Sequence, residues 1–351
     1  MDLTNSKIIT IVITTFIFTA SIMPLIIKIA KHIGAIDKPN SRKVHTKEIP
    51  RLGGLAIFLG MLLGYMLFAK QTTEMISVLI GSFIIVLTGV VDDINPIKAK
   101  SKLIGQIAAA LVITFYGNIT LSNIDAFGIQ INFGVFSSIV TIIFILGITN
   151  CINLIDGLDG LSGGISAIYF LTIGIISIFK GQLFGLNVIL SFIMLGSTLG
   201  FLVYNFNPAK IFAGDTGSML LGFIISIISL LGFKNITMTS IVIPMLLLAI
   251  PILDTLFAII RRKLKRQSIS KPDKCHIHHQ LLDKKMGHKN TVLIIYGIDG
   301  LFALASIFYV LGDRILGMIV YGILTLIVLW FMLFTSVISE ENLTKKLTRK
   351  K

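Results

Sequence analysis

Long apolar blocks recur along the whole chain and are separated by short polar stretches. Each block has about 17 to 23 residues, the length at which a helix crosses roughly 30 Å of hydrocarbon with a rise of about 1.5 Å per residue. Hydrophobic residues make up 54% of the sequence and charged residues only 14%, whereas about a quarter of the residues in a soluble domain are charged. This pattern excludes a secreted, fibrous, disordered or soluble multidomain protein and predicts a chain that folds inside a membrane.

The blocks of low charge predict eleven membrane-spanning helices. They lie near residues 8–27, 52–69, 75–91, 103–117, 135–152, 161–179, 183–203, 217–233, 239–260, 291–311 and 315–336. We therefore predict an all-α polytopic bundle that forms a single transmembrane domain over residues 1–339, followed by a basic tail over residues 340–351. After the fourth span, the alternating stretch ITLSNIDAFGIQINFG predicts a small hairpin at the far membrane surface.

Lysine and arginine are distributed unevenly between the two sides of this bundle. Most of the 31 Lys and Arg residues fall between spans one and two, three and four, seven and eight, and nine and ten, or in the tail. The other side receives only Lys7, Lys70, Lys180, Lys234 and Arg314. By the positive-inside rule the first side is cytoplasmic, so the N-terminus is predicted to lie outside and the C-terminus inside.

The net charge of +14 thus belongs largely to the cytoplasmic face of the cell membrane. There it would bind anionic lipid head groups and attract anionic substrates. Nucleic acid is not an expected partner, because the basic loops lack an associated nucleic-acid-binding fold.

Five aspartates lie at the predicted cytoplasmic mouth of the bundle. Asp92 and Asp93 end the third span, Asp156 and Asp159 follow the fifth, and Asp215 precedes the eighth. Two carboxylates about 4 Å apart repel by roughly 4 kcal/mol at an effective dielectric of about 20, so converging carboxylates need a cation, protons or basic neighbours. Oxygen ligands beside flexible backbone suit Mg²⁺ or Mn²⁺ and point to phosphate chemistry. Solvated helix caps are the alternative, which three such motifs on one face disfavour.

Two spacings inside this set add local expectations. Asp156 and Asp159 are three residues apart, so both carboxylates share a face if the local backbone is helical. Lys102 begins the fourth span and is placed to extend into the polar mouth near Asp92 and Asp93.

Asp254 and Asp299 differ from these residues because they fall inside predicted spans. An ionisable residue there costs at least about 2.5 kcal/mol and usually faces a cavity or a partner. Asp254 is close enough to the cytoplasmic end to reach the proposed site, whereas Asp299 is equally compatible with a structural role.

Two cytoplasmic loops carry the basic and histidine residues of interest. The segment IDKPNSRKVHTKEIPRLGG contains Arg42, Lys43 and His45, and serves as a topology signal, a phosphate-facing loop, or both. The longest loop, residues 261–290, contains the motif PDKCHIHH with three histidines, namely His276, His278 and His279. Zinc is the less favoured alternative there, because a closed zinc site usually draws on two separated ligand pairs. Histidines among lysines and arginines can bind phosphate oxygens or donate protons at neutral pH.

Taken in order, DKPNSRKVHTKEIPRLGG, GVVDDINPIKAKSKLIGQ, NCINLIDGLDGL, IFAGDTGS, PILDT and PDKCHIHH resemble the polyprenyl-phosphate N-acetylhexosamine-1-phosphate transferase family, glycosyltransferase family 4. The resemblance implies that the active-site loops lie near residues 28–51, 92–102, 153–160, 204–216 and 261–290. The HIHH form resembles the undecaprenyl-phosphate GlcNAc-1-phosphate transferase branch, which initiates teichoic acid, O-antigen or enterobacterial common antigen. Ile277 interrupts the three consecutive histidines typical of the phospho-MurNAc-pentapeptide branch, and Gln280 stands where many relatives have arginine.

The resemblance implies that GlcNAc-1-phosphate is transferred from UDP-GlcNAc to undecaprenyl phosphate at the cytoplasmic face, releasing UMP. Another UDP-HexNAc or UDP-MurNAc-pentapeptide is the alternative donor, and homodimer formation is left open. A transporter or lipid flippase is the alternative from another class. It is disfavoured because transporters usually bind substrate near the midplane and often have repeated halves, whereas here the acidic motifs gather at one surface.

Family roles can be carried over to matching positions of this chain. Asp215 is the first choice for a ligand of Mg²⁺, with Mn²⁺ as a substitute, and Asp92 would deprotonate or orient the lipid phosphate. The residues expected to shape the metal and nucleotide pocket are Asp93, Asn153, Asp156 and Asp159, of which Asp93 and Asn153 are further metal ligands. The residues expected to bind substrate phosphates are Lys102, Arg42, Lys43, His45, His276, His278 and His279. Direct attack is favoured over a two-step mechanism, because the acceptor is already an anionic nucleophile.

Overall fold

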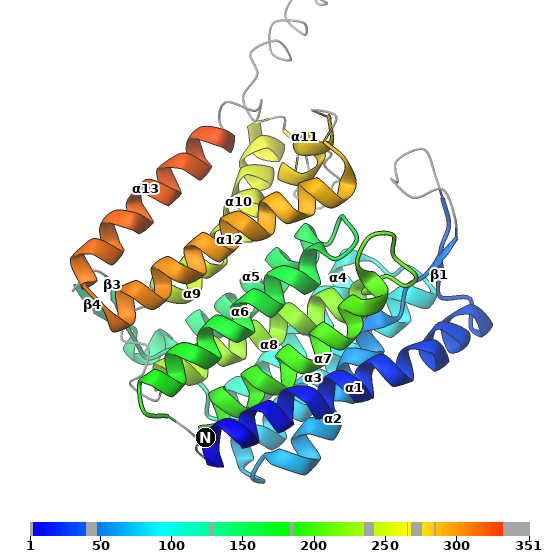
Figure 1. Ribbon diagram of the computed structural model, residues 1–351, viewed down its shortest axis with the longest axis horizontal. Coiled ribbons are helices and arrows are strands. Elements are labelled where there is room, and N and C mark those ends of the chain that lie inside the picture. Colours follow the sequence, from blue (N-terminus) through cyan, green and yellow to red (C-terminus); the bar gives the residue numbers. More distant parts are fainter. Residues whose placement is uncertain are drawn as a thin grey trace, which may run out of the picture.

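The computed structural model describes residues 3–39, 48–126, 129–182, 185–234, 242–264, 266–267, 276–283 and 286–332. Nearly all regular structure in these residues is helical (Figure 1). The longer helices are α1 (Leu3–His32), α2 (Gly53–Phe68), α3 (Thr73–Ile94), α4 (Ala99–Leu111), α5 (Ser137–Ile155), α6 (Leu161–Phe179), α7 (Leu186–Asn205), α8 (Gly214–Lys234), α10 (Ala249–Leu264), α12 (His288–Leu311) and α13 (Arg314–Met332). The short ones are α9 (Val242–Leu247), α11 (Ile277–Asp283), the π-helix Val112–Tyr116 and the 3-10 helix Gly134–Phe136.

Seven helical segments are long and apolar enough to cross a membrane, counted among the described residues. They are Ser6–His32, Thr73–Ile94, Gly134–Ile155, Leu161–Phe179, Leu186–Asn205, Gly214–Gly232 and His288–Leu311. Two shorter apolar helices cover Gly53–Phe68 and Ile315–Trp330. The prediction of a helical polytopic membrane protein is therefore confirmed, while the count of eleven spans and the orientation of the termini stay predictions.

Over the described residues, each predicted span coincides with helix. Three spans are not single regular helices, and one of these is the fifth, which begins in the 3-10 helix Gly134–Phe136 and continues in α5. The fourth consists of α4 and the π-helix that continues it, and the ninth is divided into α9 and α10 around Leu248. The alternating stretch after the fourth span forms the predicted hairpin, with β3 (Asn123–Ala126) antiparallel to β4 (Ile129–Asn132). A second antiparallel pair joins β1 (Ile36–Asp37) to β2 (Ile49–Pro50).

Helix α8 lies at the centre of the bundle and packs against α2, α3, α5, α6 and α7. Its apolar residues from Met219 to Leu231 are almost completely buried, as expected of a helix that is hydrophobic on all sides. Glycines bring the start of α8 close to its neighbours: a Cβ on Gly54 would lie 2.0 Å from the Gly217 nitrogen, and one on Gly89 would lie 2.4 Å from the Thr216 Cα. Close backbone contact therefore gathers α2, α3 and α8 at one end of the bundle.

The two ends of the bundle differ in what they carry (Figure 1). The N-terminal end of α1 and the β3–β4 hairpin lie towards one end. The C-terminal end of α1, strand β1 and the loops that follow α5 and α7 lie towards the other. Every acidic motif of the predicted site belongs to this second end.

Candidate active site

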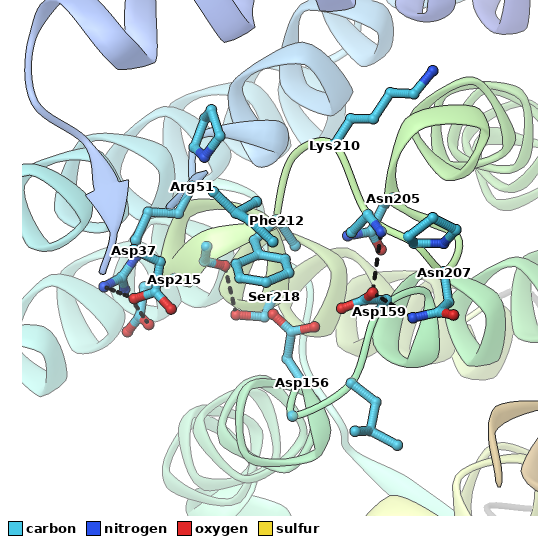
Figure 2. A pocket seen from close by; sticks show the side chains of 18 of the residues that line it. Asp37, Arg51, Asp156, Asp159, Asn205, Asn207, Lys210, Phe212, Asp215 and Ser218 are labelled. Carbon is cyan, nitrogen blue, oxygen red and sulfur yellow. Dashed lines mark hydrogen bonds and ion pairs between the residues drawn. The ribbon is translucent and has the colours of Figure 1, made fainter. Parts of the chain in front are cut away.

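A cavity of about 830 Å³ opens at the end of the bundle where β1 lies. Figure 2 shows Asp37 and Asp215 beside Arg51 on one side of it, and Asp159 with Asn205 and Asn207 on the other. Further lining residues are Lys31, Glu48, Asn153, Asp156, Gly157, Lys210, Phe212, Ser218, His279 and His288. The volume falls in the usual range for small-molecule sites of about 300 to 1,000 Å³.

Arg51 is held at the cavity by backbone hydrogen bonds on both sides of its segment. Its N–H donates to the Ala35 carbonyl at 3.0 Å, and the Phe212 N–H donates to the Pro50 carbonyl at 2.8 Å. The Gly53 N–H in turn donates to the Phe212 carbonyl at 2.9 Å. The segment before α2 thus lies between the end of α1 and the loop before α8, and this fixes the direction of the arginine.

Three carboxylates meet next to Arg51. One oxygen of each of Asp92, Asp93 and Asp215 lies within 4.8 Å of the others. Asp92 and Asp93 are each 3% exposed, whereas Asp215 lines the cavity. The guanidinium Nη2 of Arg51 lies 3.0 Å from Asp93, 3.8 Å from Asp215 and 3.9 Å from Asp92. The sequence expectation that these three aspartates converge is met, and the arginine that balances their charge was not singled out by it.

Asp93 is fully engaged with protein donors. Its Oδ1 accepts hydrogen bonds from Arg51 Nε at 3.1 Å and from the Asp215 N–H at 3.0 Å. Its Oδ2 accepts from the Thr216 N–H at 3.1 Å and from the Thr216 hydroxyl at 2.7 Å. A carboxylate has about four lone-pair sites, so these donors use the capacity of Asp93. Asp93 therefore caps α8 from α3, and it fixes the backbone from which Asp215 projects.

The first residue of α8 shows why this contact needs glycine. Gly214 has a φ of 69°, which favours glycine, and a Cβ there would lie 2.3 Å from Asp93 Oδ2. The glycine therefore leaves room for the Asp93 carboxylate at the start of α8.

Lys102 bonds to the other two carboxylates of the cluster, Asp92 and Asp215. Its Nζ lies 2.8 Å from Asp92 Oδ2 and also bonds to Asp215 Oδ2. The other oxygen of Asp92 accepts the Ile97 N–H at 2.9 Å. The expectation that Lys102 extends to the polar mouth near Asp92 is confirmed.

The pKa of Arg51 reflects the negative charge of this cluster. Burial alone would lower the pKa of the Arg51 guanidinium, but Asp93, Asp37, Asp215 and Asp92 together raise it above its usual value. The protein thus surrounds the acidic cluster with two cations, Arg51 and Lys102, that remain charged at neutral pH.

The donor set at this cluster fits a hard divalent cation. All candidate ligand atoms are carboxylate oxygens, the type that Mg²⁺ and Mn²⁺ prefer. Asp215 offers an oxygen to the cavity, and Asp92 lies directly behind it across the Lys102 ammonium. Asn153, also expected to be a ligand, donates from Nδ2 to the Ser218 hydroxyl at 2.8 Å.

Asp156 and Asp159 do not share a helical face, because α5 ends at Ile155 and the backbone after it turns. Asp156 accepts the Ser162 hydroxyl at 2.6 Å. Burial raises the pKa of Asp156 to about 7, the Ser162 hydrogen bond opposes this shift, and the nearby negative charges of Asp215 and Asp93 add to it. The condition for a shared face, a helical backbone from Asp156 to Asp159, is thus not met, although both residues line the cavity.

Asp159 connects two loops at the rim of the cavity. Its Oδ2 accepts hydrogen bonds from Asn207 Nδ2 at 2.8 Å and from the Ala209 N–H at 3.1 Å, while its own N–H donates to His288 Nε2 at 2.9 Å. Asn205 reinforces this connection, because its Oδ1 accepts the Gly160 N–H at 2.9 Å. Asn205 and Asn207 were missed by sequence reasoning, although both belong to the NFNPAK segment ahead of α8.

The three loop histidines lie in two different environments. His279 lines the cavity, whereas His276 and His278 are buried behind it. Arg42, Lys43 and His45, which were expected to hold phosphates, lie outside the described residues.

The chain is similar in sequence to known proteins. The family model described as "Glycosyl transferase family 4" matches residues 75–233. A relative from Bacillus subtilis, described as a "Probable undecaprenyl-phosphate N-acetylglucosaminyl 1-phosphate transferase", is 41% identical over 308 residues, which cover 86% of this chain and 84% of the relative.

Two further relatives come from other bacteria. A "Decaprenyl-phosphate N-acetylglucosaminephosphotransferase" from Mycobacterium tuberculosis is 34% identical over 85% of this chain and 83% of its own length. An "Undecaprenyl-phosphate alpha-N-acetylglucosaminyl 1-phosphate transferase" from Haemophilus influenzae is 34% identical over 84% of this chain and 86% of its own length. The similarity therefore extends over most of each chain.

Proposed function

Because this chain belongs to glycosyl transferase family 4, we propose that it transfers GlcNAc-1-phosphate from UDP-GlcNAc to undecaprenyl phosphate, forming undecaprenyl-diphospho-GlcNAc and UMP. The observation that carries this proposal is the cavity at one end of the membrane bundle, with Asp215 and Arg51 in its wall and Asp92, Asp93 and Lys102 behind them. The printed names of the three relatives support the GlcNAc-phosphate donor and a polyprenyl phosphate acceptor.

The reaction joins a nucleotide from water to a lipid that stays in the bilayer. A cavity that opens at the end of the bundle suits both, because the nucleotide enters from solvent while the isoprenoid chain remains among the helices. The excess of lysine and arginine on the same side supports a cytoplasmic location of this end by the positive-inside rule. We place the active site there, in the cell membrane, at the first membrane step of a cell-envelope glycopolymer.

The chemical step is a displacement at phosphorus. An oxygen of the lipid phosphate forms a bond to the β-phosphorus of UDP-GlcNAc, and the bond between that phosphorus and the bridging oxygen to UMP breaks. Attack by one anion on another is opposed by charge, so catalysis requires positive charge around the diphosphate. Lys31, Arg51 and Lys210 supply it from the cavity wall.

Asp215 and Asp92 are the residues that would hold Mg²⁺, since their oxygens lie together and Asp215 opens to the cavity. When bound, the ion would neutralise charge that develops on the leaving UMP. We assign Asp93 to the support of Asp215 and not to metal binding, because the protein already occupies its oxygens. Asp92 orients the Lys102 ammonium at 2.8 Å, and in this proposal Lys102 would contact the acceptor phosphate. Direct attack needs no covalent enzyme intermediate.

The remaining wall of the cavity suits the nucleoside. Phe212 offers an aromatic ring on which a base stacks, and Asn205, Asn207 and Asp159 form the polar rim opposite Arg51 (Figure 2). The donor sugar is the part that this geometry constrains least. Another UDP-HexNAc or UDP-MurNAc-pentapeptide would have the same nucleotide and diphosphate.

The proposal is tested with purified protein in detergent, undecaprenyl phosphate, Mg²⁺ and separate UDP-sugars, by measuring UMP release and the mass of the lipid product. UDP-GlcNAc is expected to give equal amounts of UMP and undecaprenyl-diphospho-GlcNAc, and omission of Mg²⁺ is expected to stop the reaction. Robust turnover with UDP-MurNAc-pentapeptide and none with UDP-GlcNAc would overturn the donor assignment.

A further inference from the structure

The segment between α10 and α12 carries three histidines that occupy different environments. His276 and His278 are buried, whereas His279 is partly exposed and lines the cavity. Burial lowers the pKa of His278 to about 3, and the neighbouring His279 adds to this effect, so its ring is neutral at physiological pH. Only His279 among the three is thus in a position to touch a substrate.

Asp254 binds the start of this segment from α10. Its Oδ2 lies 2.7 Å from His276 Nδ1, and its Oδ1 accepts the Ile277 N–H at 2.9 Å. This contact, together with the Ile277 N–H bond, fixes the plane of the His276 ring beside the carboxylate. Asp254 is 1% exposed, and a buried carboxylate of this kind is stabilised by such partners.

The three imidazole rings transmit this orientation to the cavity. The rings of His276 and His278 are parallel, with an interplanar angle of 1° and centroids 5.7 Å apart. The rings of His278 and His279 have centroids 4.4 Å apart at an angle of 44°. On its other side His278 lies against Gly157, where a Cβ would be 2.3 Å from Nε2. The stack is therefore fixed at Asp254 and confined at Gly157.

We propose that Asp254 is a positioning residue that holds His279 at the cavity wall through His276 and the adjoining ring of His278. The inference rests on the proposed function, because it places His279 against the diphosphate of the sugar nucleotide. Asp254 on α10 does not itself line the cavity, but through this contact it keeps one wall of the nucleotide pocket in place.

Asp299 provides the matched comparison. It is also an aspartate with 1% exposure, on α12, yet neither of its oxygens has a hydrogen-bond partner among the described residues. Burial alone therefore does not give an aspartate of this bundle the contacts that Asp254 makes. Asp299→Ala removes the same atoms as Asp254→Ala without touching the histidine segment.

The first experiment is a double-mutant cycle on UMP release. Asp254→Ala is expected to raise the KM for UDP-GlcNAc about tenfold, because small displacements of a positioned group cost one to two orders of magnitude. The KM for undecaprenyl phosphate should stay within about twofold of wild type. In a His279→Ala background, Asp254→Ala is expected to cost less than about twofold, since residues that act through one another are not additive.

Conservative variants separate positioning from general stability. Asp254→Asn can still accept the Ile277 N–H and can donate to His276 in its other tautomer, so it is expected to retain most activity. His276→Asn, whose amide can donate to Asp254, is expected to retain more activity than His276→Ala. Asp299→Ala is expected to leave both KM values unchanged. Losses that multiply in the cycle, or equal losses for Ala and Asn, would overturn the positioning role.

A second readout does not depend on activity. In protein labelled with [15N]histidine, the His279 signal, identified by its loss in His279→Ala, is expected to shift in Asp254→Ala and to stay in place in Asp299→Ala. An unchanged His279 signal in Asp254→Ala would contradict the inference. If wild-type protein released no UMP from any UDP-sugar, the proposed function would fail, while the labelling experiment would still decide the role of Asp254.

Discussion

Two buried carboxylates, Asp93 and Asp254, each bind the start of a helix at the same end of this molecule. Asp93 on α3 binds Arg51 and the backbone at the start of α8, and Asp254 on α10 binds His276 and the backbone at the start of α11. Each carboxylate fixes the first residues of another helix and pairs with a basic side chain. Asp93 joins elements that lie far apart in the sequence, whereas Asp254 joins two consecutive helices.

The two contacts differ in strength and in what they carry. Asp93 receives donors from Arg51, Asp215 and Thr216, including a guanidinium that stays charged, and directly supports the aspartate at the cavity. Asp254 contacts one imidazole, that of His276, and one backbone N–H, that of Ile277. It acts on the cavity indirectly, through the rings of His276 and His278. We therefore expect changes at the acidic cluster to affect chemistry most, and changes at the histidine segment to affect donor binding.

Asp215→Asn tests the acidic side of this comparison and should have the largest effect. Loss of the charge that faces the cavity is expected to lower turnover by about 10²- to 10³-fold, the usual cost of removing one group that stabilises transition-state charge. UMP release as a function of Mg²⁺ or Mn²⁺ concentration measures it. Activity close to wild type would remove Asp215 from the metal role.

Asp93→Asn tests whether Asp93 supports the start of α8 or instead binds the metal. An amide cannot accept all the hydrogen bonds that Asp93 accepts, and its NH₂ would face a donor at the start of α8. The buried mismatch is expected to cost about 1 to 3 kcal/mol of unfolding free energy, together with a marked loss of turnover. Thermal unfolding in detergent measures the first and UMP release the second. A variant as stable as wild type would argue against the capping role.

His278 gives a pH test on the histidine side. Its pKa is about 3 in the folded protein against about 6.5 when unfolded, so the unfolded chain takes up the proton first as pH falls. This residue therefore lowers the free energy of unfolding below about pH 6.5, by up to about 1.4 kcal/mol per pH unit. Asp156, with its pKa raised to about 7, acts in the opposite direction, because stability from its protonated form is lost as pH rises.

Because the two effects oppose each other, the useful quantity is the difference between wild type and His278→Gln. That difference in unfolding free energy is expected to move in favour of the variant as pH falls from about 6.5 to about 4, since only wild type carries the histidine. Urea or thermal unfolding across this range measures it. A difference that does not change with pH would show that His278 is not held neutral.

Asp313→Asn should have the smallest effect. Asp313 accepts the Ile315 N–H at 2.8 Å ahead of α13, and asparagine caps helices about equally well. It follows the end of α12 opposite to His288, which lines the cavity. Turnover and stability are expected to equal wild type, which makes this variant the matched control for Asp215→Asn. A large loss of turnover would mean that the site extends further than the cavity.

The sequence predicted the helices well because membrane spans are set by continuous apolar length, a local property. It also placed Asp92, Asp93 and Asp215 at one surface, since each ends or begins a span. The division of the ninth span around Leu248 was missed, because the apolar pattern continues through the break. The site was therefore predicted at the level of motifs on a common face.

The pairing within that face could not be predicted. Arg51 joins the cluster because backbone bonds to Ala35 and Phe212 hold it there, and no spacing in the sequence encodes those contacts. Asp93 and Asp215 look alike as residues at helix ends, yet one is saturated by the protein and the other faces the cavity. Such differences arise from tertiary packing at close glycine contacts.

The most direct test of this account is Mn²⁺ binding, followed by electron paramagnetic resonance, in wild type, Asp215→Asn and Asp93→Asn, with thermal unfolding to verify that each variant is folded. Wild type is expected to bind one tightly held ion, Asp215→Asn to lose it, and Asp93→Asn to retain it with lower affinity. Tight binding that survives in Asp215→Asn but disappears in a folded Asp93→Asn would contradict the assignment of ligand and support.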